Sequence, residues 1–147
     1  MQTKTLYETD FNLWVESQVA SLQAQSWDNL DLENLIEEIE GLTRRDKRAL
    51  TSFLRVALLH ILQWQYQPQK RSDSWITSVL NAQSEITLIL EDSPSLKNFI
   101  PEAIAKAYPL ARREAAKQTR LPISTFPEHL PYTFKAVMEW DLEAPGE

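Results

Sequence analysis

Residues 60–68, HILQWQYQP, gather the side chains of this chain that are best suited to chemistry. His60 and Trp64 are four residues apart, so on a helix they share a face. A buried imidazole needs a hydrogen-bond partner, and the earlier run NLIEEIE (34–40) supplies three glutamates. We expect a glutamate to pair with His60. In such a pair, His60 is either a general base oriented by the glutamate or a core histidine whose hydrogen bond the glutamate satisfies.

A reaction or ligand site in this region would be a polar pocket, here called the candidate pocket. Its members are Glu37, Glu38, Glu40, His60, Trp64, Arg71 and Trp75. Di-iron bundles need the motif Glu-x-x-His twice, but Ala57 and Phe126 stand three residues before the two histidines. We therefore predict no metal and no cofactor. A site made from Glu37, Glu40 and His60 is the alternative.

Composition excludes several kinds of site. The chain has no cysteine, which removes thiol nucleophiles and cysteine zinc sites and is typical of a reducing compartment. It has only two glycines, Gly41 and Gly146. Phosphate-binding loops, dinucleotide folds and nucleophile elbows need several glycines for their tight turns. The usual forms of these sites are therefore excluded.

Charge and hydropathy indicate the kind of partner. The formal net charge is −6, which argues against nucleic acid as a direct ligand because the phosphate backbone would be repelled. Two basic clusters form a candidate contact surface: Arg44, Arg45 and Arg48, with Lys47 beside them, and Arg112, Arg113 and Lys117. A solvated, ion-paired face is the simpler interpretation of both. Neither a membrane span nor a signal peptide is recognised, so we expect a cytoplasmic protein.

Hydrophobic periodicity predicts helices throughout the chain. Within FLRVALLHIL (53–62) only two residues are polar, so a helix over about 45–67 should be enclosed by other helices and end at Pro68. A second helix, over about 31–42, should pack beside it after a break at Gly41. A continuous helix is the alternative. The stripes expected to be buried are Phe11, Trp14, Val15, Gln18, Val19 and Leu22; Leu32, Leu35, Ile36, Ile39 and Leu42; and Trp75, Ile76, Val79, Leu80, Ile86 and Leu90.

These elements predict an all-α fold, a compact bundle of six to seven helices around the central apolar helix. Alanine recurs at every fourth position from Ala103 to Ala115, forming a small-residue ridge against which another helix can approach closely. Pro101 and Pro109 should divide or kink that region. With no repeats or linker in view, we expect residues 1–147 to form a single domain with an ordered core over about 7–142 and short flexible ends.

A series of motifs carries a family resemblance. YETDFNLWVESQ (7–18), LDLENLIEEIE (30–40), HILQWQYQP (60–68), SDSWITSV (72–79), SPSL (93–96), AYPLARREA (107–115) and TFP (125–127) occur in this order. Together they resemble the bacterial, chiefly cyanobacterial, family catalogued as domain of unknown function 29, over about residues 7–142. The resemblance implies a small all-helical domain with no assigned activity or catalytic residue. The chain departs from the family pattern at Gln63, where lysine is common.

Three functions follow from these observations. The first is a non-enzymatic protein-interaction or regulatory module whose partner is a protein, either a second copy or another chain. The second is an enzyme or a protein that binds a small ligand or metal, using a Glu37–Glu40–His60–Trp64 pocket open to solvent. The third is an antitoxin-like partner protein that contacts its target through the basic clusters. The first predicts an exposed apolar patch or a symmetric dimer.

Overall fold

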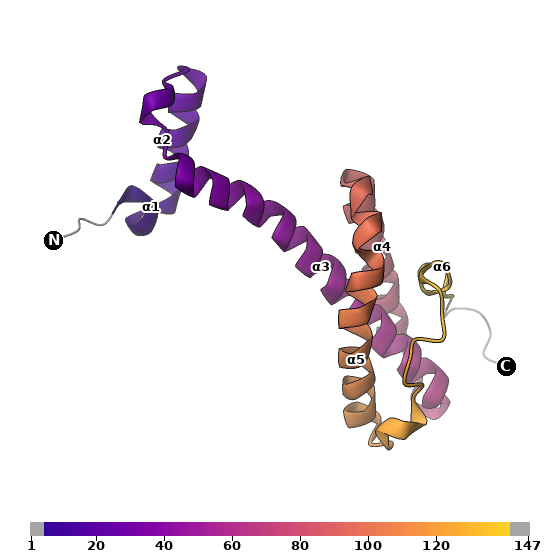
Figure 1. The fold of residues 1–147 in the computed structure, drawn as a ribbon. Helices are drawn as coiled ribbons and strands as arrows, with labels where there is room; N and C mark the ends of the chain where they lie inside the picture. Colours follow the sequence, from indigo (N-terminus) through magenta and orange to yellow (C-terminus); the bar gives the residue numbers. More distant parts are fainter. Residues whose placement is uncertain (1–4, 142–147) are drawn as a thin grey trace. The chain divides into compact units, whose positions relative to one another are not determined.

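The computed structural model describes residues 5–141, and its chain divides into two compact units (Figure 1). Unit 1 is Met1–Arg44 and unit 2 is Arg45–Glu147. Residues 5–141 form helices and turns without a strand among them, so the predicted all-α class is confirmed. The flexible ends predicted from sequence lie largely outside these residues. No helix within residues 5–141 is both long and apolar enough to cross a bilayer.

The helices follow one another with short connections. Unit 1 contains α1 (Leu6–Thr9), α2 (Phe11–Gln23), η1 (Trp27–Asn29) and the first part of α3 (Leu32–Tyr66). Unit 2 contains the rest of α3, then η2 (Pro68–Lys70), α4 (Asp73–Asp92), η3 (Pro94–Phe99), α5 (Ile100–Thr119), η4 (Ile123–Thr125) and α6 (Phe134–Met138).

The predicted break at Gly41 is wrong, because α3 is one helix from Leu32 to Tyr66. One interior glycine costs only about 1 kcal/mol relative to alanine, and helix propagation is cooperative. Arg44 also pairs across the glycine, with Glu37 at 2.8 Å and with Glu40 at 3.9 Å. The helix ends where predicted, since Pro68 disfavours helical geometry in the residue before it.

The predicted central helix supplies the core of unit 2. Its buried members are Leu50, Leu54, Ala57, Leu58, Leu59, Ile61 and Leu62. They pack with α4 through Val79, Ala82 and Ile86, and with the alanine ridge of α5. The ridge is confirmed: Ala103, Ala107, Ala111 and Ala115 are all 0% exposed. α5 runs through Pro109 without dividing, while Pro101 lies in its first turn, where a missing N–H is tolerated.

The apolar stripes predicted for unit 1 are mostly wrong. On α2 only Trp14 and Gln18 are buried, whereas Phe11, Val19 and Leu22 are exposed. On α3 four of the five predicted residues are exposed: Leu32, Ile36, Ile39 and Leu42. Leu80 of α4 is also exposed, although its neighbour Val79 is buried. A unit of this size buries a smaller fraction of its surface than a large domain does, so periodicity alone overstates how many apolar residues are covered.

The alanine ridge yields a test of the core. Replacing Ala111 with leucine forces a larger side chain into a fully buried position, so we expect a loss of about 1–3 kcal/mol in the free energy of unfolding. The measurement is urea denaturation followed by circular dichroism. Ala105→Leu is the matched control, because Ala105 is exposed on the same helix and leucine is a good helix former. Equal stability of the two variants would contradict the packing.

Candidate functional site

His60 lies in a short chain of side-chain hydrogen bonds that joins α3 to α5. Its Nδ1 is 2.8 Å from Gln63 Oε1, and since an amide oxygen only accepts, the imidazole donates from Nδ1. Gln63 Nε2 in turn donates to Gln118 Oε1 at 2.6 Å. His60 is half-buried, whereas Gln63 is buried. The partner of His60 is therefore an amide one turn later on its own helix.

Burial sets the protonation of His60. Desolvation lowers the pKa of the imidazole below its usual value, and the hydrogen bond to Gln63 and the negative charge of Glu114 oppose this only in part. Glu114 itself is ion-paired with Arg55. The histidine is therefore neutral at pH 7 and serves as a hydrogen-bond donor to Gln63. The hydrogen bond that orients its ring goes to this amide rather than to a carboxylate, unlike the arrangement of an oriented general base.

Gln67 and Arg71 make the polar contacts at the end of α3. Arg71 Nε donates to the Trp64 carbonyl at 2.9 Å, and its guanidinium lies 4.7 Å from the centroid of the Trp64 ring. Gln67 Nε2 donates to the Thr119 carbonyl at 3.4 Å. The last four carbonyls of a helix lack intrahelical donors. Arg71 supplies a donor to one of these carbonyls, that of Trp64. Trp64 and Arg71 are thus brought together as a helix end, and Trp75 lies half-buried in α4.

The predicted pairing of His60 with a glutamate is wrong. Glu37, Glu38 and Glu40 belong to the same continuous helix as His60, twenty or more residues earlier. Side chains of one helix meet when they are three or four residues apart. Two of the glutamates pair instead with Arg44, and Glu38 Oε1 accepts a 2.6 Å hydrogen bond from the Tyr7 hydroxyl. Residues 5–141 hold no group of three or more His, Asp or Glu placed to bind a metal.

The basic residues of the candidate contact surface divide between structural and exposed positions. Arg112 is structural: it donates from Nε and Nη2 to the Phe126 carbonyl at 3.2 and 3.1 Å, and from Nη2 to the Ile123 carbonyl at 3.1 Å. It thereby fixes η4 to α5. The remaining members are exposed: Arg44 in unit 1, and Arg45, Arg48, Arg113 and Lys117 in unit 2.

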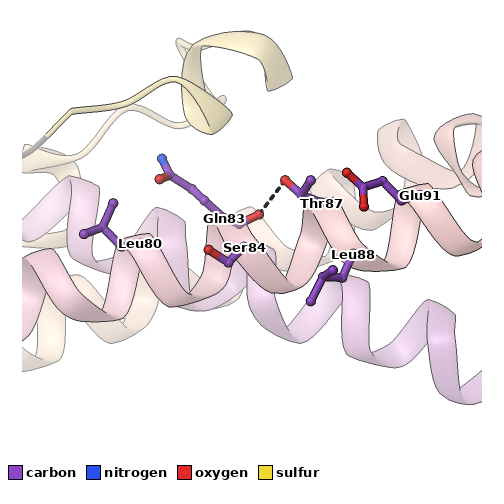
Figure 2. Close-up of a pocket in the computed structure, with 6 residues that line it drawn as sticks. All are labelled: Leu80, Gln83, Ser84, Thr87, Leu88 and Glu91. Carbon is purple, nitrogen blue, oxygen red and sulfur yellow. Dashed lines mark hydrogen bonds between the residues drawn. The ribbon is translucent and has the colours of Figure 1, made fainter.

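A surface hollow of about 380 Å³ lies along α4, a feature that sequence reasoning did not anticipate. Figure 2 shows its six lining residues on this one helix: Leu80, Gln83, Ser84, Thr87, Leu88 and Glu91. Gln83 Nε2 donates to the carbonyls of Val137 and Trp140, at 3.0 and 3.1 Å, which holds the end of α6 against α4. Glu91 is its single titratable group, so the hollow lacks an acid–base pair.

Unit 1 is held together by a polar seam centred on Asp31. Asp31 Oδ2 accepts from Trp14 Nε1 at 3.0 Å, and the Asp31 amide donates to Gln18 Oε1 at 2.8 Å. Asn34 donates to both carboxylate oxygens, so Asp31 also caps α3. Hydrogen bonds from Asn34 and Trp14 lower the pKa of Asp31. Tyr7, which bonds to Glu38, packs edge-on against Trp14 with ring centroids 4.7 Å apart.

This seam leaves an apolar row of α3 uncovered. Leu32, Ile36 and Ile39 are 59%, 54% and 62% exposed, and their spacing places them on one helical face. Each is followed directly by an exposed glutamate, so Glu33, Glu37 and Glu40 form a second row at the same spacing. We call these the apolar row and the acidic row. Periodicity predicted Leu32, Ile36 and Ile39 as part of a buried stripe, and Glu37 and Glu40 were assigned to the candidate pocket, but nothing in the sequence singled out Glu33.

A comparison with known families now places the chain. The family described as "Domain of unknown function DUF29" matches residues 6–142. The chain belongs to this family. Neither the curated proteins nor the solved structures contain a match. Membership in DUF29 brings no assigned activity.

The depressed pKa of His60 predicts how the stability of this DUF29 chain depends on pH. The unfolded histidine titrates near pH 6.5 and the folded one lower, so the unfolded state binds more protons between these two values. The His60 contribution is complete above about pH 6.5 and is lost as the pH falls through the folded pKa. We therefore expect the wild type to lose more stability between pH 7.5 and 5 than His60→Gln does, by urea denaturation. Parallel losses would refute this.

The hydrogen bonds of Asp31 predict that replacing this residue loosens unit 1 locally. Asp31→Ala removes the acceptor of Trp14 and the cap of α3, so amides of residues 6–44 should exchange with deuterium about fivefold faster, the factor expected for a typical helix cap. Hydrogen-exchange mass spectrometry measures this. Asp28→Ala is the control, because Asp28 is exposed in η1. If Asp28→Ala accelerates exchange equally, Asp31 has no special role.

Proposed function

We propose that this DUF29 chain is a non-enzymatic protein-interaction module of the cytoplasm that binds another protein through unit 1. The observation that carries the proposal is the distribution of exposed apolar side chains. Of the fourteen large hydrophobic residues exposed within residues 5–141, ten belong to unit 1, which holds less than a third of the chain. Isolated exposed leucines need no explanation, but a concentration of this kind is typical of a binding surface.

Charge supports a different chain as the partner rather than a second copy. Residues 1–44 carry nine Asp and Glu against two basic residues, a formal charge of −7, whereas residues 45–147 carry +1. Joining two copies through unit 1 would bring two strongly acidic surfaces together, and like charges facing each other across an interface are unfavourable. A partner with a basic surface would instead be attracted and oriented by the same charge.

The other two functions have less support. An enzyme built on the candidate pocket needs His60 and a glutamate to line one cavity, but the hydrogen-bond partner of His60 is Gln63. An antitoxin-like role is one form of the interaction module. The basic clusters offer it a weaker surface than expected, since Arg112 is engaged by backbone carbonyls. It also requires a companion reading frame beside the gene. The absence of cysteine agrees with a reducing cytoplasm.

Two triple variants test the proposed function. Leu32→Ser/Ile36→Ser/Ile39→Ser removes the apolar row. The control, Leu80→Ser/Leu88→Ser/Leu110→Ser, changes three residues of unit 2 that are also exposed on helices. Each protein is used to capture partners from an extract of the native cell, and a partner lost only with the first variant is purified and titrated by calorimetry. Burying one such side chain is worth about 1.5–3 kcal/mol, so the affinity should fall at least tenfold.

The outcome depends on comparing the two variants. Circular dichroism must first show that both retain the helicity of the wild type, as expected for substitutions at exposed positions. A partner that binds the wild type and the control equally, and the row variant at least tenfold more weakly, supports the proposal. If every captured protein binds all three forms alike, unit 1 is not the binding surface and the proposal fails.

A further inference from the structure

We propose that the partner of unit 1 is a basic amphipathic helix that lies along the apolar row and pairs its lysines or arginines with the acidic row. This inference rests on the proposed function and adds the chemistry of the partner. It depends on how the two rows are arranged on α3, on what the seam leaves uncovered, and on the charge of unit 1.

The apolar row has the geometry of a helix-binding face. Leu32, Ile36 and Ile39 are spaced i, i+4 and i+7, the anchor pattern by which one helix packs on another. They extend over about 10 Å of the helix axis, and Leu42 continues the exposed apolar surface into the next turn. A partner helix of two to three turns would cover this length.

The hydrogen bonds that join α1 and α2 to α3 lie away from this face. Within residues 5–44, α1 and α2 reach α3 through polar groups: Tyr7 to Glu38, and Trp14 and Gln18 to Asp31. Asp31 and Glu38 are seven residues apart, so they share a helical face that is distinct from the face of Leu32 and Ile39. The docking of α1 and α2 therefore uses the polar side of α3, and its apolar row remains exposed.

The acidic row determines the charge of the occupant. Glu33, Glu37 and Glu40 each follow a member of the apolar row, so the two rows run in parallel about 100° apart around the helix. Arg44 pairs with Glu37 and Glu40, but these side chains are about half exposed or more, and exposed ion pairs contribute little. A helix with leucines along one face and lysines along the adjacent edge would match both rows.

The same charge disfavours the other occupants of an apolar face. A second copy would place one acidic row against another, and an anionic lipid surface would be repelled by unit 1. A neutral peptide would gain no charge attraction from the carboxylates of the acidic row. A cationic helix gains from both rows, and its association should weaken as salt screens the charges.

The test uses the full-length chain and fluorescein-labelled synthetic peptides of about 18 residues, long enough to form a helix on binding. The first peptide has leucines at helical spacing with lysines along one edge. The second is its scrambled form, with the same composition, and the third replaces the lysines with glutamates. Fluorescence anisotropy measures binding at two salt concentrations.

The lysine helix should bind at least tenfold more tightly than the scrambled peptide, and the glutamate peptide should not bind. Ile36→Ser/Ile39→Ser should weaken the lysine helix at least tenfold, and Glu33→Gln/Glu40→Gln should weaken it and reduce the salt dependence. Leu80→Ser/Leu88→Ser is the matched control in unit 2 and should leave binding unchanged.

Other outcomes overturn the inference. Equal binding of the ordered and scrambled lysine peptides would mean charge attraction without a helix site. A dimer in sedimentation, or binding to phosphatidylcholine vesicles, that Ile36→Ser/Ile39→Ser abolishes would make the occupant a second copy or a membrane. If the peptides fail while a captured protein still depends on the apolar row, this inference falls and the proposed function stands. If the lysine helix binds but no captured protein depends on the row, the proposed function falls alone.

Discussion

The hydrogen bonds of Asp31 are the constraint on which the surface of unit 1 depends. Its carboxylate caps α3 and accepts the Trp14 indole N–H, while its amide donates to Gln18. A buried indole without an acceptor would lose free energy, so α2 must approach α3 on the side where Asp31 stands. Because a helix presents its residues around a full circle, that choice of side leaves the row of Leu32, Ile36 and Ile39 exposed among the described residues.

The two units of the chain differ in what their apolar residues do. In unit 2, α3 from Leu50 to Leu62 contributes fully buried side chains, and the alanine ridge of α5 faces the same core. The polar groups there are satisfied locally, as His60 is by Gln63. In unit 1 most of the large apolar residues are exposed, and those of the apolar row lie beside carboxylates. One unit is thus organised as a packed core and the other as an acidic, apolar surface suited to binding.

Sequence patterns predicted the local features well. Three features were predictable: the helix over residues 45–67, its end at Pro68 and the alanine ridge. Each depends on periodicity or on proline geometry within one segment. The continuity of α3 through Gly41 was not predictable from the local sequence. An interior glycine costs only about 1 kcal/mol, and whether the helix continues depends on the residues around it. The hydrogen-bond acceptor of His60 was expected to be a glutamate, because a break at Gly41 would have let residues 34–40 fold back beside His60. The acceptor is Gln63. Periodicity shows that Leu32, Ile36 and Ile39 share a face, but it does not show what covers that face.

The central claim is that the apolar row is open in the free protein, and the chain has no cysteine to interfere with a direct measurement. Single-cysteine variants Ile36→Cys and Leu58→Cys report on the row and on the core, where Leu58 is 1% exposed. With a thiol reagent, Ile36→Cys should react at nearly the rate of the urea-unfolded protein, and Leu58→Cys at least a hundredfold more slowly. Equal protection of the two cysteines would show that the row is covered and contradict the account.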